Sequence, residues 1–341
     1  MRANYFTQIS KPRLIKKSSE EFSKKEFDFI QDPQNGCAIS IADFNYIDIK
    51  NYNNLNALPY AFKSDFDVLQ WACALLSESL VGRALLQEAE QTGWCLSAGE
   101  LDNNGFYLNA HDKLIELDFC GMEPQALGQS THYRYNLICV LAKALRDIWH
   151  EERWGDFEEN YKPESVLLLE RARAADTDCI FVLIAWELRS NGHDDVWRHV
   201  LSSDDGDIAD VLVSIINRYP SAQYNGLVLA HLFRQWYTNI DRLDAQDHNT
   251  LQHMDYIVED NDIKFGDKKV TAQEFEFLSV LPDENCYLET LGHTVATDPF
   301  FNGLNDPVNQ SHLFQIIYDN NVTYVQNIPF RDAKLARKFK K

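Results

Sequence analysis

Apolar residues return every three or four positions along most of this chain, which is the spacing of one face of an α-helix. The first such stretch covers residues 67–92, and Gly93 follows it as a residue that commonly ends a helix. The pattern predicts a mostly helical protein. The predicted helices cover residues 67–92, 133–154, 163–189, 207–218, 224–237, 250–257 and 271–278.

Three short segments interrupt the helical pattern and predict strands. They are residues 94–97, 105–108 and 114–117, and the turn-forming sequence D-N-N-G separates the first two. A small sheet followed by a long run of helices is typical of an α+β fold. We therefore expect a predominantly helical α+β protein with a helical C-terminal half.

Composition along the chain predicts three regions. Residues 1–60 are rich in Asn, Lys, Ser and Asp and hold only isolated apolar clusters, which favours an N-terminal arm or satellite element. Residues 61–310 carry the regular pattern and are expected to form one domain. Residues 311–341 form a C-terminal segment that ends in a basic tail.

The overall charge narrows the classes of partner. With 32 basic and 52 acidic residues the chain carries a formal net charge of −20, which repels nucleic acid and anionic membrane surfaces. Neither nucleic acid nor a membrane is therefore expected as a partner. The seven cysteines include no C-x-x-C pair, so neither a disulfide framework nor a cysteine zinc site is expected. No targeting segment or long apolar run is recognisable, and this predicts a cytoplasmic protein.

Residues 143–150, inside the second long predicted helix, read K-A-L-R-D-I-W-H. Further matching segments lie at residues 173–179, 185–188, 233–237, 287–288 and 298–300. Together these segments resemble the zincin metallopeptidases, and more narrowly a bacterial family of uncharacterised metallopeptidases whose active helix reads approximately H-E-L-R-H-A-W-Q. The resemblance spans about residues 65–310. It implies a zincin-like core, in which an edge strand lies over the active helix and a second helix supplies the third zinc ligand.

The chain departs from this family pattern at the positions that carry the chemistry. Lys143, Ala144 and Asp147 stand where the motif has His, Glu and His, and Asp178 falls at the third ligand position, with Asp176 as the alternative. A catalytic zinc site needs imidazole ligands, an open position for water and a carboxylate as general base. We therefore expect no zinc cofactor and no hydrolysis.

The same positions suggest what replaces the metal. Positions 143 and 147 share a helix face, so the Lys143 ammonium is expected to reach the Asp147 carboxylate, with Asp178 arriving from the facing helix. In the alternative interpretation, Lys143 and Asp147 form an exposed surface pair of little energetic consequence.

Three functional hypotheses follow. The first is a metallopeptidase-like protein that has lost zinc binding and proteolysis and keeps its cleft to bind a peptide or protein. The second is an active metal-dependent hydrolase that uses a shifted site near Asp147, His150 and Asp178, with Glu151 and Asp176 as further candidate ligands. The third is a structural or interaction protein whose cleft is filled.

Overall fold

The computed structural model describes residues 38–44, 62–101, 105–155, 160–221, 226–259, 264–325 and 328–330. Most of the predicted N-terminal arm and the basic C-terminal tail lie outside these residues. The chain divides into two compact units, each built from several segments. Unit 1 comprises Met1–Arg153, Asp176–Gln235 and Leu281–Asn285, and unit 2 comprises Trp154–Ala175, Trp236–Val280 and Cys286–Lys341.

Unit 1 contains a small mixed sheet. Its strands are β1 (Ile39–Ser40), β2 (Cys95–Gly99), β3 (Phe106–Asn109) and β4 (Leu114–Asp118), in the order β1-β2-β4-β3. β2 and β4 are parallel, whereas β1 and β3 pair antiparallel with their neighbours. The three predicted strands are confirmed. β1 was not predicted, because two residues are too short for an alternating pattern to show.

The first predicted helix is wrong as a single element. The structure divides it into α1 (Asp65–Leu76) and α2 (Leu80–Gln91). Ser79 is the N-cap of α2 and its Oγ accepts a hydrogen bond from the Gly82 amide at 2.9 Å. A capping serine stabilises a new helix start. The apolar spacing continues through the break, and this is why periodicity alone missed it.

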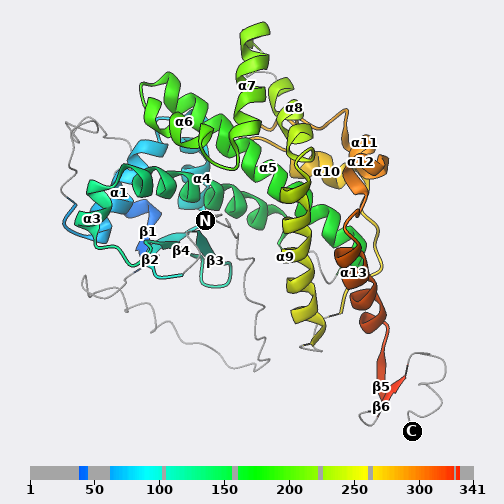
Figure 1. The fold of residues 1–341 in the computed structure, drawn as a ribbon. Helices are drawn as coiled ribbons and strands as arrows, with labels where there is room; N and C mark the ends of the chain where they lie inside the picture. Colours follow the sequence, from blue (N-terminus) through cyan, green and yellow to red (C-terminus); the bar gives the residue numbers. More distant parts are fainter. Residues whose placement is uncertain are drawn as a thin grey trace. The chain divides into compact units, whose positions relative to one another are not determined.

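Helix α4 (Thr131–Trp154) confirms the predicted second long helix. Its expected core face is buried, and consists of Leu137, Val140, Leu141, Leu145 and Ile148. The helix lies along the sheet (Figure 1). Near the end of α4, Glu152 accepts a hydrogen bond from Trp94 Nε1 at 2.7 Å and forms an ion pair with Lys113. Trp94 immediately precedes β2, and Lys113 immediately precedes β4. These contacts join α4 to the start of both parallel strands.

The remaining helices of unit 1 follow the predicted order. They are α3 (Pro124–Gln129), the second half of α5 (Pro163–Ser190), α6 (Asp194–Leu201), α7 (Gly206–Arg218) and α8 (Leu227–Trp236). Of these, α3 and α6 were not predicted.

Unit 2 is helical, with a short terminal hairpin. It holds the first half of α5, α9 (Ile240–Glu259), α10 (Ala272–Leu278), α11 (Gly292–Thr297), α12 (Pro299–Asn302), α13 (Pro307–Asn320), β5 (Thr323–Val325) and β6 (Ile328–Phe330). α9 begins ten residues before its predicted start, where the Asn239 side chain accepts a hydrogen bond from the Arg242 amide. A buried pair between Arg171 and Asp247 ties α5 to α9, and Arg171 also donates to the Phe301 and Gly303 carbonyls.

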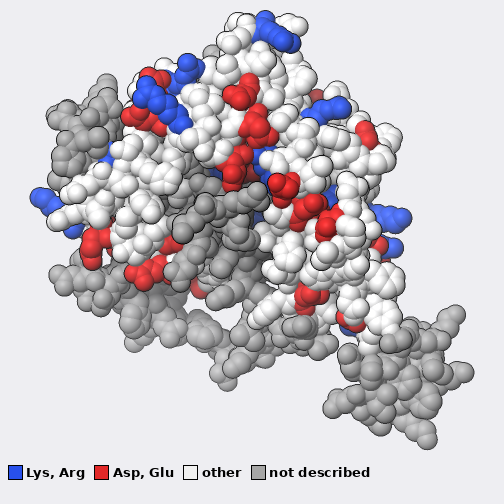
Figure 2. All heavy atoms as spheres, viewed as in Figure 1, with Lys and Arg blue, Asp and Glu red and all other residues white. Residues whose placement is uncertain are grey.

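The face shown in Figure 2 carries Asp and Glu side chains together with several Lys and Arg side chains. Within the described part of the chain, no helix combines the length and the apolar character needed to cross a membrane.

Candidate functional site

A set of polar side chains lies inside unit 1, where α4 faces the second half of α5. Lys143, Arg146, Asp147 and His150 occur at helical positions i, i+3, i+4 and i+7, so they share one face of α4. Residues 176–178 of α5 lie opposite, and each of them pairs with a member of this face. We call these residues, together with Asp205, the polar cluster.

Lys143 lies between two carboxylates. Its Nζ is 2.7 Å from Asp178 Oδ1 and 2.8 Å from Asp205 Oδ2, and its side chain is only 18% exposed. The ring of Phe181 lies beneath the ammonium, with 5.1 Å from Nζ to the ring centroid. Burial by itself lowers the pKa of Lys143, but attraction and hydrogen bonds from both aspartates raise that pKa above its ordinary value. The ammonium is therefore charged at any physiological pH.

Arg146 and Asp176 form a second, fully buried pair. Arg146 Nε lies 2.6 Å from Asp176 Oδ2, and a second guanidinium nitrogen lies 3.1 Å from Oδ1. His150 Nε2 is 2.9 Å from the same Oδ2. Burial raises the pKa of Asp176, but Arg146 and His150 outweigh burial and lower it to about 2. Asp176 is thus an ionised carboxylate inside the core.

Asp147 has a different set of neighbours. Its Oδ1 accepts a hydrogen bond from Thr177 Oγ1 at 2.9 Å, and His150 Nδ1 lies 3.9 Å from the same oxygen. Ala144 is completely buried and carries no group that can take a proton.

The structure thus brings together most of the residues singled out from the sequence. The expected approach of Lys143 to Asp178 is present. The Asp147 carboxylate, which was expected to meet Lys143, accepts a hydrogen bond from Thr177, and the contacts shown for Lys143 are to Asp178 and Asp205. The alternative of an exposed surface pair is wrong, because Lys143 is mostly shielded and Asp147 is 8% exposed. Glu151 follows His150 directly and belongs to another face of the helix. Asp205 was missed, since nothing in its local sequence shows that it meets a residue more than sixty positions away.

The cluster does not fit a zinc ion. Zinc in a catalytic site takes three neutral or anionic ligands and leaves a fourth position open. Here a lysine ammonium lies against two of the carboxylates, and the other carboxylates bind Arg146 and Thr177. Within the described ranges, no group of three or more His, Cys, Asp or Glu side chains is placed to hold a metal ion.

Comparison with known families relates the sequence to one family. The model of the family described as "Putative metallopeptidase family (DUF6782)" matches residues 57–288, which is more than half of the chain. The chain belongs to this family. Neither the curated proteins nor the solved structures gave a match. The zincin-like core, and the assignment of Lys143, Ala144, Asp147 and Asp178 to the metal-site positions, stay predictions.

Proposed function

We propose that this chain is a member of the metallopeptidase family that binds an extended peptide or protein segment without holding zinc and without cleaving the peptide. The observation that carries the proposal is the Lys143 ammonium, which lies against Asp178 and Asp205. The resemblance described above assigns Lys143 to the first histidine of the family motif. A charged ammonium at this point repels a divalent cation.

The chemistry of peptide hydrolysis supports the same view. In the zinc mechanism the attacking water needs the metal ion to lower its pKa and a carboxylate to accept its proton. Ala144 supplies no carboxylate, and two acids of the polar cluster, Asp147 and Asp176, are engaged with Thr177 and Arg146. A side chain that is already paired in the core is poorly placed to accept a proton from water.

Strand β3 supports peptide binding because it is at the edge of the described sheet. The Asp118 amide donates to the Gly105 carbonyl across the β3–β4 ladder. Hydrogen bonding alternates along an antiparallel pair, so the backbone N–H and C=O groups of Phe106 and Leu108 point away from β4. An extended peptide that adds a strand pairs with groups of this kind.

Metal content and proteolysis test the catalytic part of the proposal. We expect purified full-length protein to contain no stoichiometric zinc by elemental analysis and to release no more labelled fragments from casein than a buffer control. An active zinc peptidase serves as the positive control. Proteolysis by this chain that a chelator abolishes would overturn the proposal.

The binding part needs a separate measurement. Casein-derived peptides are added to the protein and amide hydrogen exchange is followed by mass spectrometry. We expect slower exchange in the segment that contains Phe106 and Leu108, since their amides point to the sheet edge. Peptide binding with protection confined to other segments would remove the edge strand from the proposal.

The shifted-site hydrolase is the second candidate, and the closeness of His150 to Asp147 and Asp176 is the observation in its favour. It predicts chelator-sensitive proteolysis that disappears in both Asp147→Ala and His150→Ala. The same casein assay therefore separates the two candidates.

A further inference from the structure

The Lys143 ammonium lies in a small site, here called the cradle, which is formed by Asp178, Asp205 and Phe181. Two carboxylates from different parts of the chain approach Nζ, Asp178 from α5 and Asp205 from the start of α7. The Phe181 ring closes a third side. The ring itself is 2% exposed, so this side of the cradle is part of the core.

The Asp205 carboxylate contacts the Lys143 ammonium and does not cap its own helix. Asp205 is the N-cap residue of α7, and an aspartate there ordinarily accepts a hydrogen bond from an amide of the first turn. The Asp205 side chain makes no such capping bond and instead accepts one from Lys143 at 2.8 Å. The start of α7 is therefore oriented towards the ammonium.

The partners around Nζ also indicate which class of cation the cradle suits. Calcium and magnesium take six or more oxygen ligands around the ion. An aromatic face binds an ammonium ion well through its quadrupole. Two carboxylate oxygens and one ring suit the three N–H donors of a primary ammonium better than they suit a divalent ion that needs six or more oxygen ligands.

We infer that Asp178, Asp205 and Phe181 form a binding site for a primary ammonium group, which Lys143 fills from within the chain. This inference deepens the proposed function. It rests on that proposal in one respect, namely that a side chain of the protein itself occupies the position of the metal ion. It implies that the site still prefers an ammonium group when Lys143 is replaced by a shorter side chain. The site of such a variant then binds a free alkylammonium ion.

The variant Lys143→Ala tests this inference. Alanine keeps Cβ and removes Cγ, Cδ, Cε and Nζ, and these four atoms together correspond to n-propylammonium. We expect n-propylammonium chloride to raise the melting temperature of Lys143→Ala by about 2 to 4 °C relative to the same concentration of sodium chloride. Methylammonium should raise it less because it lacks the apolar stem, and 1-propanol should not raise it because it lacks the charge.

A matched lysine provides the control. Lys113 also pairs with one carboxylate and lies 5.3 Å from a ring centroid, that of Trp94, but its side chain is 38% exposed. Neither Lys113→Ala nor the parent protein should gain stability from n-propylammonium over sodium chloride. The gain should also disappear from Lys143→Ala when Asp205→Asn is added. A gain that is equal in the parent, or that survives Asp205→Asn, would overturn the inference, as would no gain at all.

If Lys143→Ala does not fold, Lys143→Met provides the second test. Methionine keeps an apolar stem over Phe181 and removes the charge. Adding Asp178→Asn and Asp205→Asn to this variant should restore part of the lost melting temperature, because the two unneutralised carboxylates are then gone. No restoration would contradict the inference. Both readouts are stabilities of variants, so they are independent of zinc content, proteolysis and peptide binding.

Discussion

Replacing Asp176 with asparagine should destabilise the protein strongly. Asp176 and Arg146 are both 0% exposed, and two contacts of 2.6 and 3.1 Å join them. Asparagine keeps the volume of the side chain but removes the charge, so the Arg146 guanidinium stays buried without its counterion. Removal of one partner from a buried ion pair costs on the order of 3 to 5 kcal/mol.

The pKa of Asp176 gives a second estimate of how much the ionised carboxylate contributes to the free energy of unfolding. The carboxyl has a folded pKa of about 2 against an ordinary value of 3.8. This difference corresponds to about 2 kcal/mol of stability at neutral pH. Because the folded pKa is depressed, the contribution is fully present above pH 4 and is lost as the pH falls towards 2. The stability difference between parent and Asp176→Asn should therefore narrow over this range.

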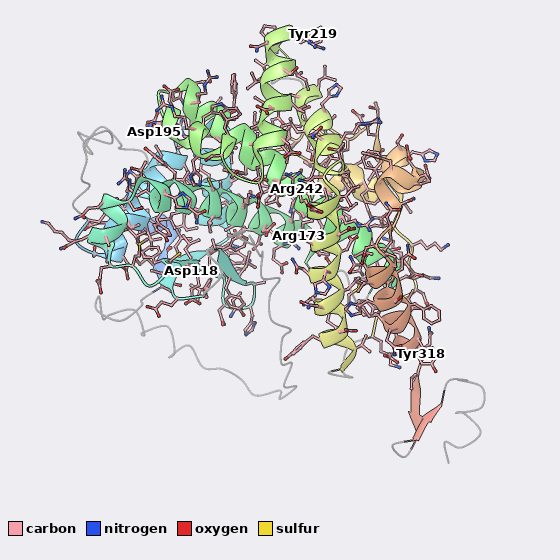
Figure 3. The ribbon with its side chains drawn as sticks, in the orientation of Figure 1. Asp118, Arg173, Asp195, Tyr219, Arg242 and Tyr318 are labelled. Carbon is pink, nitrogen blue, oxygen red and sulfur yellow. The ribbon has the colours of Figure 1, made fainter. Side chains whose placement is uncertain are left out.

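Chemical unfolding at pH 7 and at pH 3 measures both effects, with Asp195→Asn as the control. Asp195 forms a pair of similar length, 2.7 Å to Arg198, but the two side chains are 50% and 72% exposed. Figure 3 labels Asp195 on the outer helix α6. We expect its replacement to cost less than about 1 kcal/mol. If Asp176→Asn costs no more than Asp195→Asn at pH 7, the argument from burial is refuted.

Three further predictions concern other parts of the fold. Asp247→Asn should cost on the order of 3 to 5 kcal/mol in chemical unfolding, because it leaves the fully buried Arg171 without its carboxylate, and a loss below about 1 kcal/mol would contradict this. Ser79→Ala should cost about 1 to 2 kcal/mol, since α2 loses its N-cap bond to the Gly82 amide; an unchanged thermal melt would show that the cap contributes nothing. Burial lowers the pKa of His199, and the charge of His132 lowers it further, to about 4. The parent should therefore lose stability as the pH falls from about 6.5 to 4, and His199→Gln should flatten this part of the melting profile; equal profiles would exclude His199 as the cause.

Local spacing was enough to predict the main elements. The sequence placed α4 and α5 and the three strands β2 to β4 close to their observed bounds. It also showed that Lys143, Asp147 and His150 share a helix face, because side-chain direction in a helix depends only on position along the chain. Family membership was likewise recognisable from short segments scattered through residues 65–310, and the family model confirms it.

Local spacing failed where a short-range hydrogen bond competed with it. The break between α1 and α2 depends on one serine cap, and the early start of α9 depends on the Asn239 cap. Each such bond contributes only about 1 kcal/mol, which is enough to move a helix boundary but too little to leave a pattern over ten residues. Strand β1 was missed for a related reason, since its two residues become a strand only by pairing with β2.

Tertiary structure alone decided which partners the polar face of α4 meets. The sequence determined which side chains share that face, and the fold brought Asp205 and Phe181 to Lys143, with Arg146 and His150 both on Asp176. These contacts join residues 26 to 62 positions apart, and no local rule selects one distant acid over another. The selection depends on packing of whole helices, because a buried charge is tolerated only where the fold supplies its counterion.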